Sequence, residues 1–145
     1  MSTSHKHIHY ELTKAIYTAL SGNVTVSGTT YPVYQSVPST PVSVYVRIGE
    51  IIDRDNGTKD DYVYEGTITI MVNDESQIGV AERKLSFSIM DKVRSLLKTS
   101  RTNVLSMTGF TMITFTPDTS SEIMNLGDGG KPQILLIDIY RFIIQ

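Results

Sequence analysis

The chain has 145 residues, of which 40% are hydrophobic and 19% are charged, and its formal net charge is −2. This length suits one domain with its own core, so a single domain is expected over residues 1–145. The slight negative charge argues against broad nucleic-acid binding, and the absence of cysteine excludes disulfides, thiolate zinc sites and cysteine nucleophiles. The N-terminus lacks the apolar core of a signal peptide, and no apolar run approaches the ~20 residues that span a bilayer, so we expect a soluble protein.

The first helix is predicted over residues 6–20, where apolar residues recur at helical spacing and Ser21-Gly22-Asn23 is a typical C-terminal end. Residues 1–7 are expected to be flexible, as chain ends often are. Two short strand-like pieces follow within residues 23–34, and several prolines then indicate a loop.

A long hairpin arm is predicted next. Residues 42–52 and 62–72 each alternate apolar and polar side chains, which is typical of a half-buried strand. Asn56-Gly57 lies between them, and this pair is the strongest short-range hairpin signal. Residues 53–61 are therefore placed at the tip of the hairpin.

The second half of the chain predicts one helix and two strands. The helix covers residues 76–99, and a strand follows near residues 109–116. Residues 117–132 are polar and rich in Gly and Pro, which predicts a long loop. Residues 133–144 are apolar on both faces, which predicts a central strand with helices on one side and another cover on the other. The order of elements predicts an α+β fold with two helices on one face of an antiparallel sheet.

The hairpin tip begins like a calcium loop, with Asp53, Asp55 and Gly57 close together. A calcium-binding helix–loop–helix has Gly at position 6 and a bidentate Glu at position 12. Counted from Asp53, Gly57 stands at position 5 and Glu65 is one residue late, and the flanks are strands. The segment is therefore interpreted as a hairpin tip, which is either a solvated loop whose charges prevent edge-to-edge pairing or a projecting arm that lines a channel or contacts a partner. The residues assigned to this arm are Asp53, Asp55, Lys59, Asp60 and Asp61.

No catalytic residue, metal site or cofactor is predicted. His5 and His9 would share one face of a helix, but few metal sites rest on two histidines alone. The chain has no Gly-x-Ser-x-Gly elbow, and its three histidines all lie at the N-terminus. The paired acids of the hairpin tip lack the desolvated setting that acid–base catalysis needs. The protein is therefore not expected to be an enzyme.

Each predicted helix carries a second apolar patch opposite its core-facing stripe. Interfaces are enriched in aromatic residues and arginine, so these patches predict a subunit interface. The residues assigned to it are Tyr10, Tyr17, Val80, Phe87 and Arg94. The predicted loop 117–132 also holds the apolar residues Ile123, Met124 and Leu126, which either pack beneath the domain or dock on a partner.

Several segments resemble the tail-completion, or tail-terminator, proteins of tailed bacteriophages. The resemblance spans about residues 8–144 and is carried by "VYQSVP", "YVRIGE" and the strand–helix join around Gly79. The long 117–132 loop and the Ser43-Val44 pair before Tyr45 depart from the family pattern.

The resemblance implies a structural virion protein that forms a homo-oligomeric ring, commonly a hexamer, after synthesis in the host bacterial cytoplasm. Such rings cap the tail tube or lie in the neck beside connector proteins, their sheet continues from subunit to subunit, and DNA passes through the lumen without specific binding. The acidic arm would then face the lumen, where it repels DNA phosphates, or the adjacent ring. The loop 117–132 would dock on that ring and become ordered.

Three other interpretations stay open. The first is a neck adaptor or stopper ring that matches the twelve-fold portal, which would make a dodecamer. The second is a small metal-dependent hydrolase that uses the acids of residues 53–65. The third is a monomeric adaptor that captures peptide strands at an open sheet edge.

Overall fold

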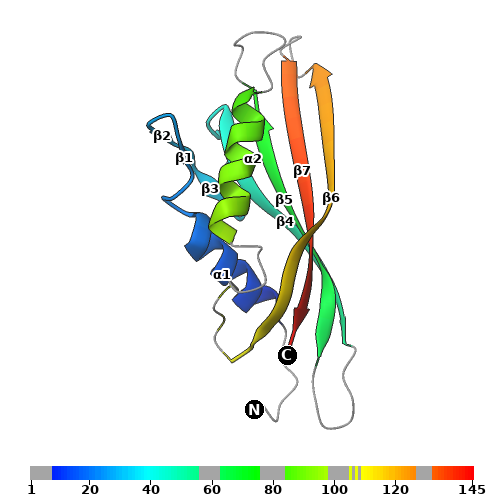
Figure 1. Ribbon diagram of the computed structural model, residues 1–145. Helices are drawn as coiled ribbons and strands as arrows, with labels where there is room; N and C mark the ends of the chain where they lie inside the picture. The colour runs from blue at the N-terminus through cyan, green and yellow to red at the C-terminus, as the bar shows by residue number, and fades with distance from the viewer. Residues whose placement is uncertain are drawn as a thin grey trace.

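A computed structural model describes residues 8–55, 63–75, 84–97, 105, 107, 109–126 and 132–145. The helices are α1 (His9–Leu20) and α2 (Lys84–Leu97). The strands are β1 (Thr25–Val26), β2 (Thr29–Thr30), β3 (Val33–Tyr34), β4 (Val44–Asp55), β5 (Tyr64–Asp74), β6 (Met112–Leu126) and β7 (Pro132–Ile144). Both helices lie on the same side of the long strands β4 to β7, as Figure 1 shows. The predicted α+β class is therefore confirmed, and the parts of the predicted helices beyond α1 and α2 lie largely outside the described residues.

The main sheet has five strands in the order β3-β4-β5-β7-β6, and β1 and β2 form a separate small hairpin. All neighbours in the main sheet are antiparallel except β3 and β4, which are parallel. The predicted hairpin is confirmed by the antiparallel pairing of β4 and β5 from Val44–Asp74 to Asp55–Tyr64. Residues 53–55, predicted to belong to its tip, instead continue β4, and residues 56–61 lie outside the described residues. The closing strand β7 lies between β5 and β6, so it has a neighbour on each side, as predicted.

The core lies between the helices and one face of this sheet. Alternate residues of β7 are buried on that face, among them Tyr140 and Phe142. From α1 and α2, side chains spaced by four residues, such as Leu12 and Ile16, meet them. The Phe115 and Tyr140 rings stack across β6 and β7 with their centroids 5.0 Å apart. The helical spacing and the strand alternation thus supply the two halves of one core.

The other face of the sheet carries no helix from the described residues (Figure 1). On β7 this face presents Leu135, Ile137 and Ile139, which are only half-buried. The finding agrees with the prediction that β7 is apolar on both faces.

The predicted loop 117–132 is wrong over residues 117–126, which continue β6. These residues pair in register with β7 from Thr119–Ile139 to Leu126–Pro132, so Ile123, Met124 and Leu126 belong to a strand. The one proline, Pro117, lies at a register shift between Pro117 and Thr119 on an edge strand, where a missing N–H interrupts little. The polar composition reflects the exposure of an edge strand, because β7 supplies the backbone ladder.

Candidate functional site

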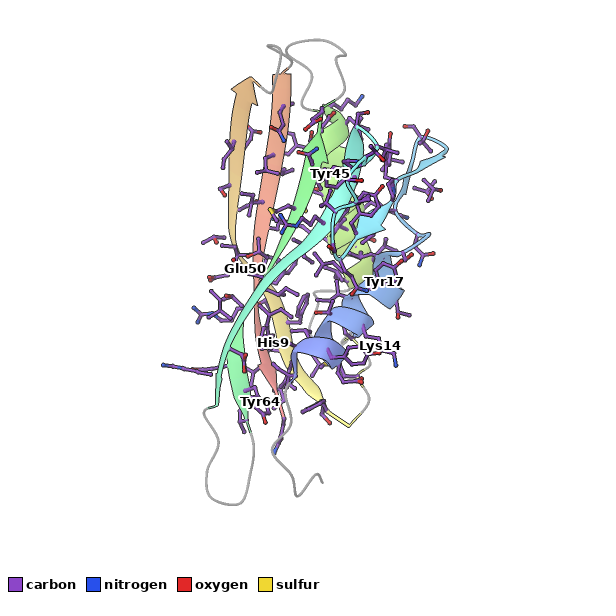
Figure 2. All side chains as sticks on the ribbon, turned by 180° about the vertical axis from the view of Figure 1, so that it is seen from behind. His9, Lys14, Tyr17, Tyr45, Glu50 and Tyr64 are labelled. Atoms are coloured by element: carbon purple, nitrogen blue, oxygen red, sulfur yellow. The ribbon has the colours of Figure 1, made fainter. Side chains whose placement is uncertain are left out.

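The helix surface assigned to subunit contact is only partly free. Tyr10 is 71% exposed and Phe87 is 45% exposed. Tyr17, labelled on α1 in Figure 2, is instead partly buried against the core. Val80 lies outside the described residues. Tyr10 and Phe87 are therefore the apolar side chains of this set that the structure places at the surface.

Arg94, also assigned to that surface, is bound within its own chain. Its Nε donates to Asp138 Oδ2 at 2.7 Å, and its Nη2 donates to Asp138 Oδ1 at 3.0 Å. Asp138 is fully buried on β7 and also accepts hydrogen bonds from Ser120 Oγ at 2.5 Å and Tyr140 Oη at 3.2 Å. These contacts join α2 to β6 and β7. A buried carboxylate must be paired in this way, since desolvation of an unpaired charge is costly.

The same network raises the pKa of two of its donors, Arg94 and Tyr140. The hydrogen bond to Asp138 raises the pKa of the Arg94 guanidinium above its usual value. Burial, and then the charge of Asp138, raise the pKa of the Tyr140 hydroxyl above that of an ordinary tyrosine. Both groups therefore remain donors at neutral pH, and the arrangement is that of a structural clamp rather than an acid–base pair.

Asp138 was missed in the sequence. The signal available was its position as the one acid within the apolar run 133–144, on the same alternation as Leu136 and Tyr140. A lone acid on a buried face requires a cation, and the cation that pairs with it is Arg94, which the sequence analysis assigned to the subunit interface.

Two side-chain contacts lie at the base of the hairpin arm. Asp53 Oδ1 contacts His9 Nε2 at the start of α1, and its side chain is 20% exposed. Arg54 donates from Nε to Glu65 Oε1 at 3.0 Å across β4 and β5. Asp55 ends β4, while Lys59, Asp60 and Asp61 lie outside the described residues. Of the residues assigned to the arm, Asp53 thus ties the arm to the helix layer.

A shallow hollow of about 270 Å³ lies beside these contacts. It is lined by Ile52, Asp53, Arg54, Glu65, Gly66, Thr67 and Arg141. A Cβ at Gly66 would lie 1.9 Å from the Ile52 carbonyl oxygen, so only glycine allows β4 and β5 to approach so closely here. Two arginines, Arg54 and Arg141, and two acids with side-chain partners, Asp53 and Glu65, line the hollow.

Within the described ranges, no group of three or more His, Asp or Glu side chains is placed to hold a metal ion. Neither helix among the described residues has the length and apolarity needed to cross a membrane.

These features define a class: a two-layer α+β domain with two helices on one face of a mixed five-stranded sheet. No protein-family model and no curated protein matches the sequence. The fold is similar to that of a chain in the structure of the virion of a native gene transfer agent (GTA) particle, with a TM-score of 0.70. The match covers 97% of this chain and 100% of that chain at 16% sequence identity, a level at which the likeness shows the fold.

Proposed function

We propose that this chain is a structural protein of a phage-like virion and that it assembles as a homo-oligomeric ring at the head–tail junction. The observation that carries the proposal is the similarity of fold, over nearly the whole of both chains, to a chain of the GTA virion. The resemblance of "VYQSVP" and "YVRIGE" to tail-terminator proteins supports the same class. The role is geometric: the protein shapes a passage for DNA and catalyses no reaction.

The open edge of the sheet supports assembly. β6 has 15 residues, and among the described residues it is the last strand of the sheet and pairs only with β7. Edges of this length tend to pair with another chain. Head-to-tail contacts around a closed ring would leave no such edge exposed.

The hairpin arm would reach from this ring toward the lumen or the adjacent ring. Its base is stiffened by the contacts of Asp53 with His9 and of Arg54 with Glu65. Negative charge beyond that base would repel the phosphate backbone and let DNA slide. The exposed Ile123 on β6, which is 44% exposed, remains a candidate contact for the neighbouring neck or tail-tube protein.

The number of subunits and the helix contact remain predictions. The tail-terminator resemblance favours a hexamer, and a neck adaptor matched to the portal would be a dodecamer. The surface of α1 and α2 that carries Tyr10 and Phe87 is the contact that the sequence predicts.

The proposal is tested by the mass of the purified chain in light scattering over a dilution series. We expect a discrete mass that is a multiple of 16.2 kDa. A single-chain mass at every concentration would contradict a ring.

The variant with Asp55, Asp60 and Asp61 all changed to Asn should keep the assembled mass but retain duplex DNA in a low-salt mobility assay, because the arm would repel phosphates less. Equal DNA retention by the variant and by the unmodified protein would contradict the proposal that the arm faces the lumen.

A further inference from the structure

The hollow at the base of the hairpin arm contains an arginine that has no partner among the described residues. Arg141 is exposed on β7, and no hydrogen bond or ion pair joins it to the part of the chain that the structure describes. The other arginine of the hollow, Arg54, donates to Glu65 from both Nε and Nη2. The N–H donors of Arg141 are therefore available to another molecule.

Aliphatic side chains lie around this guanidinium. Thr67 on β5 pairs with Ile52 on β4 and with Arg141 on β7, so these three residues form one row across the sheet. Ile52 is 65% exposed, and Ile139, two residues before Arg141 and on the same face of β7, is half-buried. A partner that contacts this row would meet charged donors and apolar area together.

The charges of the hollow favour one kind of anionic partner over another. Its lining residues carry two positive charges, on Arg54 and Arg141, and two negative charges, on Asp53 and Glu65. A nucleic-acid backbone brings a series of phosphates, which the two fixed carboxylates would repel. A single carboxylate needs only one free guanidinium, which it can bind through two parallel hydrogen bonds. The hollow is therefore matched to one carboxylate with apolar neighbours rather than to a polyanion.

We propose that the hollow binds an Asp or Glu side chain of another protein, with the carboxylate on Arg141 and adjacent apolar residues on Ile52 and Ile139. An exposed ion pair alone contributes little to binding, so the apolar contact supplies the affinity and Arg141 supplies the selectivity for a carboxylate. Arginine is also enriched at protein interfaces. The identity of the partner as a neighbouring virion protein rests on the proposed function, whereas the chemistry of the hollow does not.

The proposal is tested with the peptide acetyl-Leu-Asp-Leu-amide and the full chain carrying isotope-labelled isoleucine methyl groups. Methyl NMR suits large assemblies, and the variant Ile52→Val identifies the Ile52 signal. We expect this signal to shift and to saturate at millimolar peptide. The signal of Ile113, a side chain on β6 that is 46% exposed and does not line the hollow, should not move. Shifts of both signals, or of neither, would overturn the proposal.

Two kinds of further probe separate carboxylate recognition from other binding. Acetyl-Leu-Asn-Leu-amide keeps the shape of the first peptide without its charge and should leave the Ile52 signal nearly unchanged. Inorganic phosphate and a short DNA duplex carry charge without leucine and should shift the signal less than the Asp peptide does. An equal shift with the Asn peptide would overturn the role of the carboxylate. A larger shift with phosphate or the duplex would assign the hollow to phosphate groups and overturn the proposal.

Arg141→Gln tests the arginine itself. The change keeps a polar side chain at an exposed position, so the fold should be retained, and circular dichroism checks this. Half-saturation should need about a tenfold higher concentration of the Asp peptide, because hydrogen bonds to a charged group are lost. Arg47→Gln, at an exposed arginine of β4 that does not line the hollow, is the matched control and should bind as the unmodified chain does. Equal half-saturation for Arg141→Gln and the unmodified chain would overturn the proposal.

Failure of this proposal and failure of the proposed function give different results. A chain that assembles to the expected mass in light scattering but does not bind the Asp peptide overturns the proposal for the hollow alone. A chain that binds the peptide but keeps a single-chain mass overturns the ring and supports the chemistry of the hollow.

Discussion

Arg94 and Asp138 show how a single residue pair links helix and sheet. The guanidinium keeps contact with solvent, with 38% of its side chain exposed, whereas the Asp138 side chain is fully buried. Breaking the pair is therefore costly mainly because the buried carboxylate of Asp138 loses its cation. Removal of one partner from a buried pair is strongly destabilising because it leaves the other charge uncompensated.

Arg94→Met should lower the free energy of unfolding by about 3 kcal/mol. The change leaves Asp138 with hydroxyl donors only, from Ser120 and Tyr140. Urea unfolding at matched protein concentration measures the loss. Lys84→Met, at an exposed position of the same helix, is the control and should stay within about 0.5 kcal/mol. An equally small effect of Arg94→Met would contradict the clamp.

Tyr140 makes stability depend on pH in the alkaline range. Burial raises the pKa of its hydroxyl, so the folded chain holds this proton more tightly than the unfolded chain, where tyrosine ionises near pH 10. The contribution is complete below about pH 10 and is lost as the pH rises further. Tyr140→Phe should therefore weaken the fall of the unfolding free energy above that pH. Tyr10→Phe, at a side chain that is 71% exposed, should not change the fall, and equal slopes for both variants would contradict the assignment.

Among the elements, the positions of the strands depend on the alternation of apolar and polar residues and on the close approach of β4 to β5 at Gly66. The hairpin of β4 and β5 was predictable because its apolar residues alternate around Asn56-Gly57. The second half of β6 was not, because Thr, Ser and Glu at an edge strand look like a loop when the partner strand is unknown. Pairing with β7 decides the structure there, and such long-range pairing leaves no local signal.

Gly66 tests the close approach directly. Gly66→Ala should lower the free energy of unfolding by about 1–3 kcal/mol, because the new Cβ would meet the Ile52 carbonyl oxygen and the Asp53 Cα and force β4 from β5. Chemical denaturation measures the loss. Thr67→Ala, at the next position on β5, removes atoms without a clash and should cost less. A fully tolerated Gly66→Ala would show that the strands separate easily at the base of the arm.

The candidate sites were less predictable than the fold. Tyr10 and Phe87 are exposed, as expected for side chains opposite a core-facing stripe, and the same rule failed for Arg94 because its long side chain reaches the sheet. The contact of His9 with Asp53 joins residues far apart in sequence. Helical spacing alone contains no information on such contacts, which depend on how α1 crosses β4.

For the whole molecule, the proposed function depends on shape and self-association. Among the described residues, one sheet face is apolar and only half-buried, and the outer side of β6 has no strand neighbour. Surfaces of these two kinds are suited to contact with another chain. Repetition of the same contact around an axis satisfies every copy equally. The half-buried Ile137 and Ile139 would then lie at the lumen or beneath a neighbouring protein.

The central claim is tested most directly by electron micrographs of the purified, full-length chain, in which subunits are counted in averaged end-on views. We predict closed rings with a constant number of subunits around a central opening wide enough for duplex DNA. Isolated single chains, open filaments or aggregates without a central opening would contradict the account.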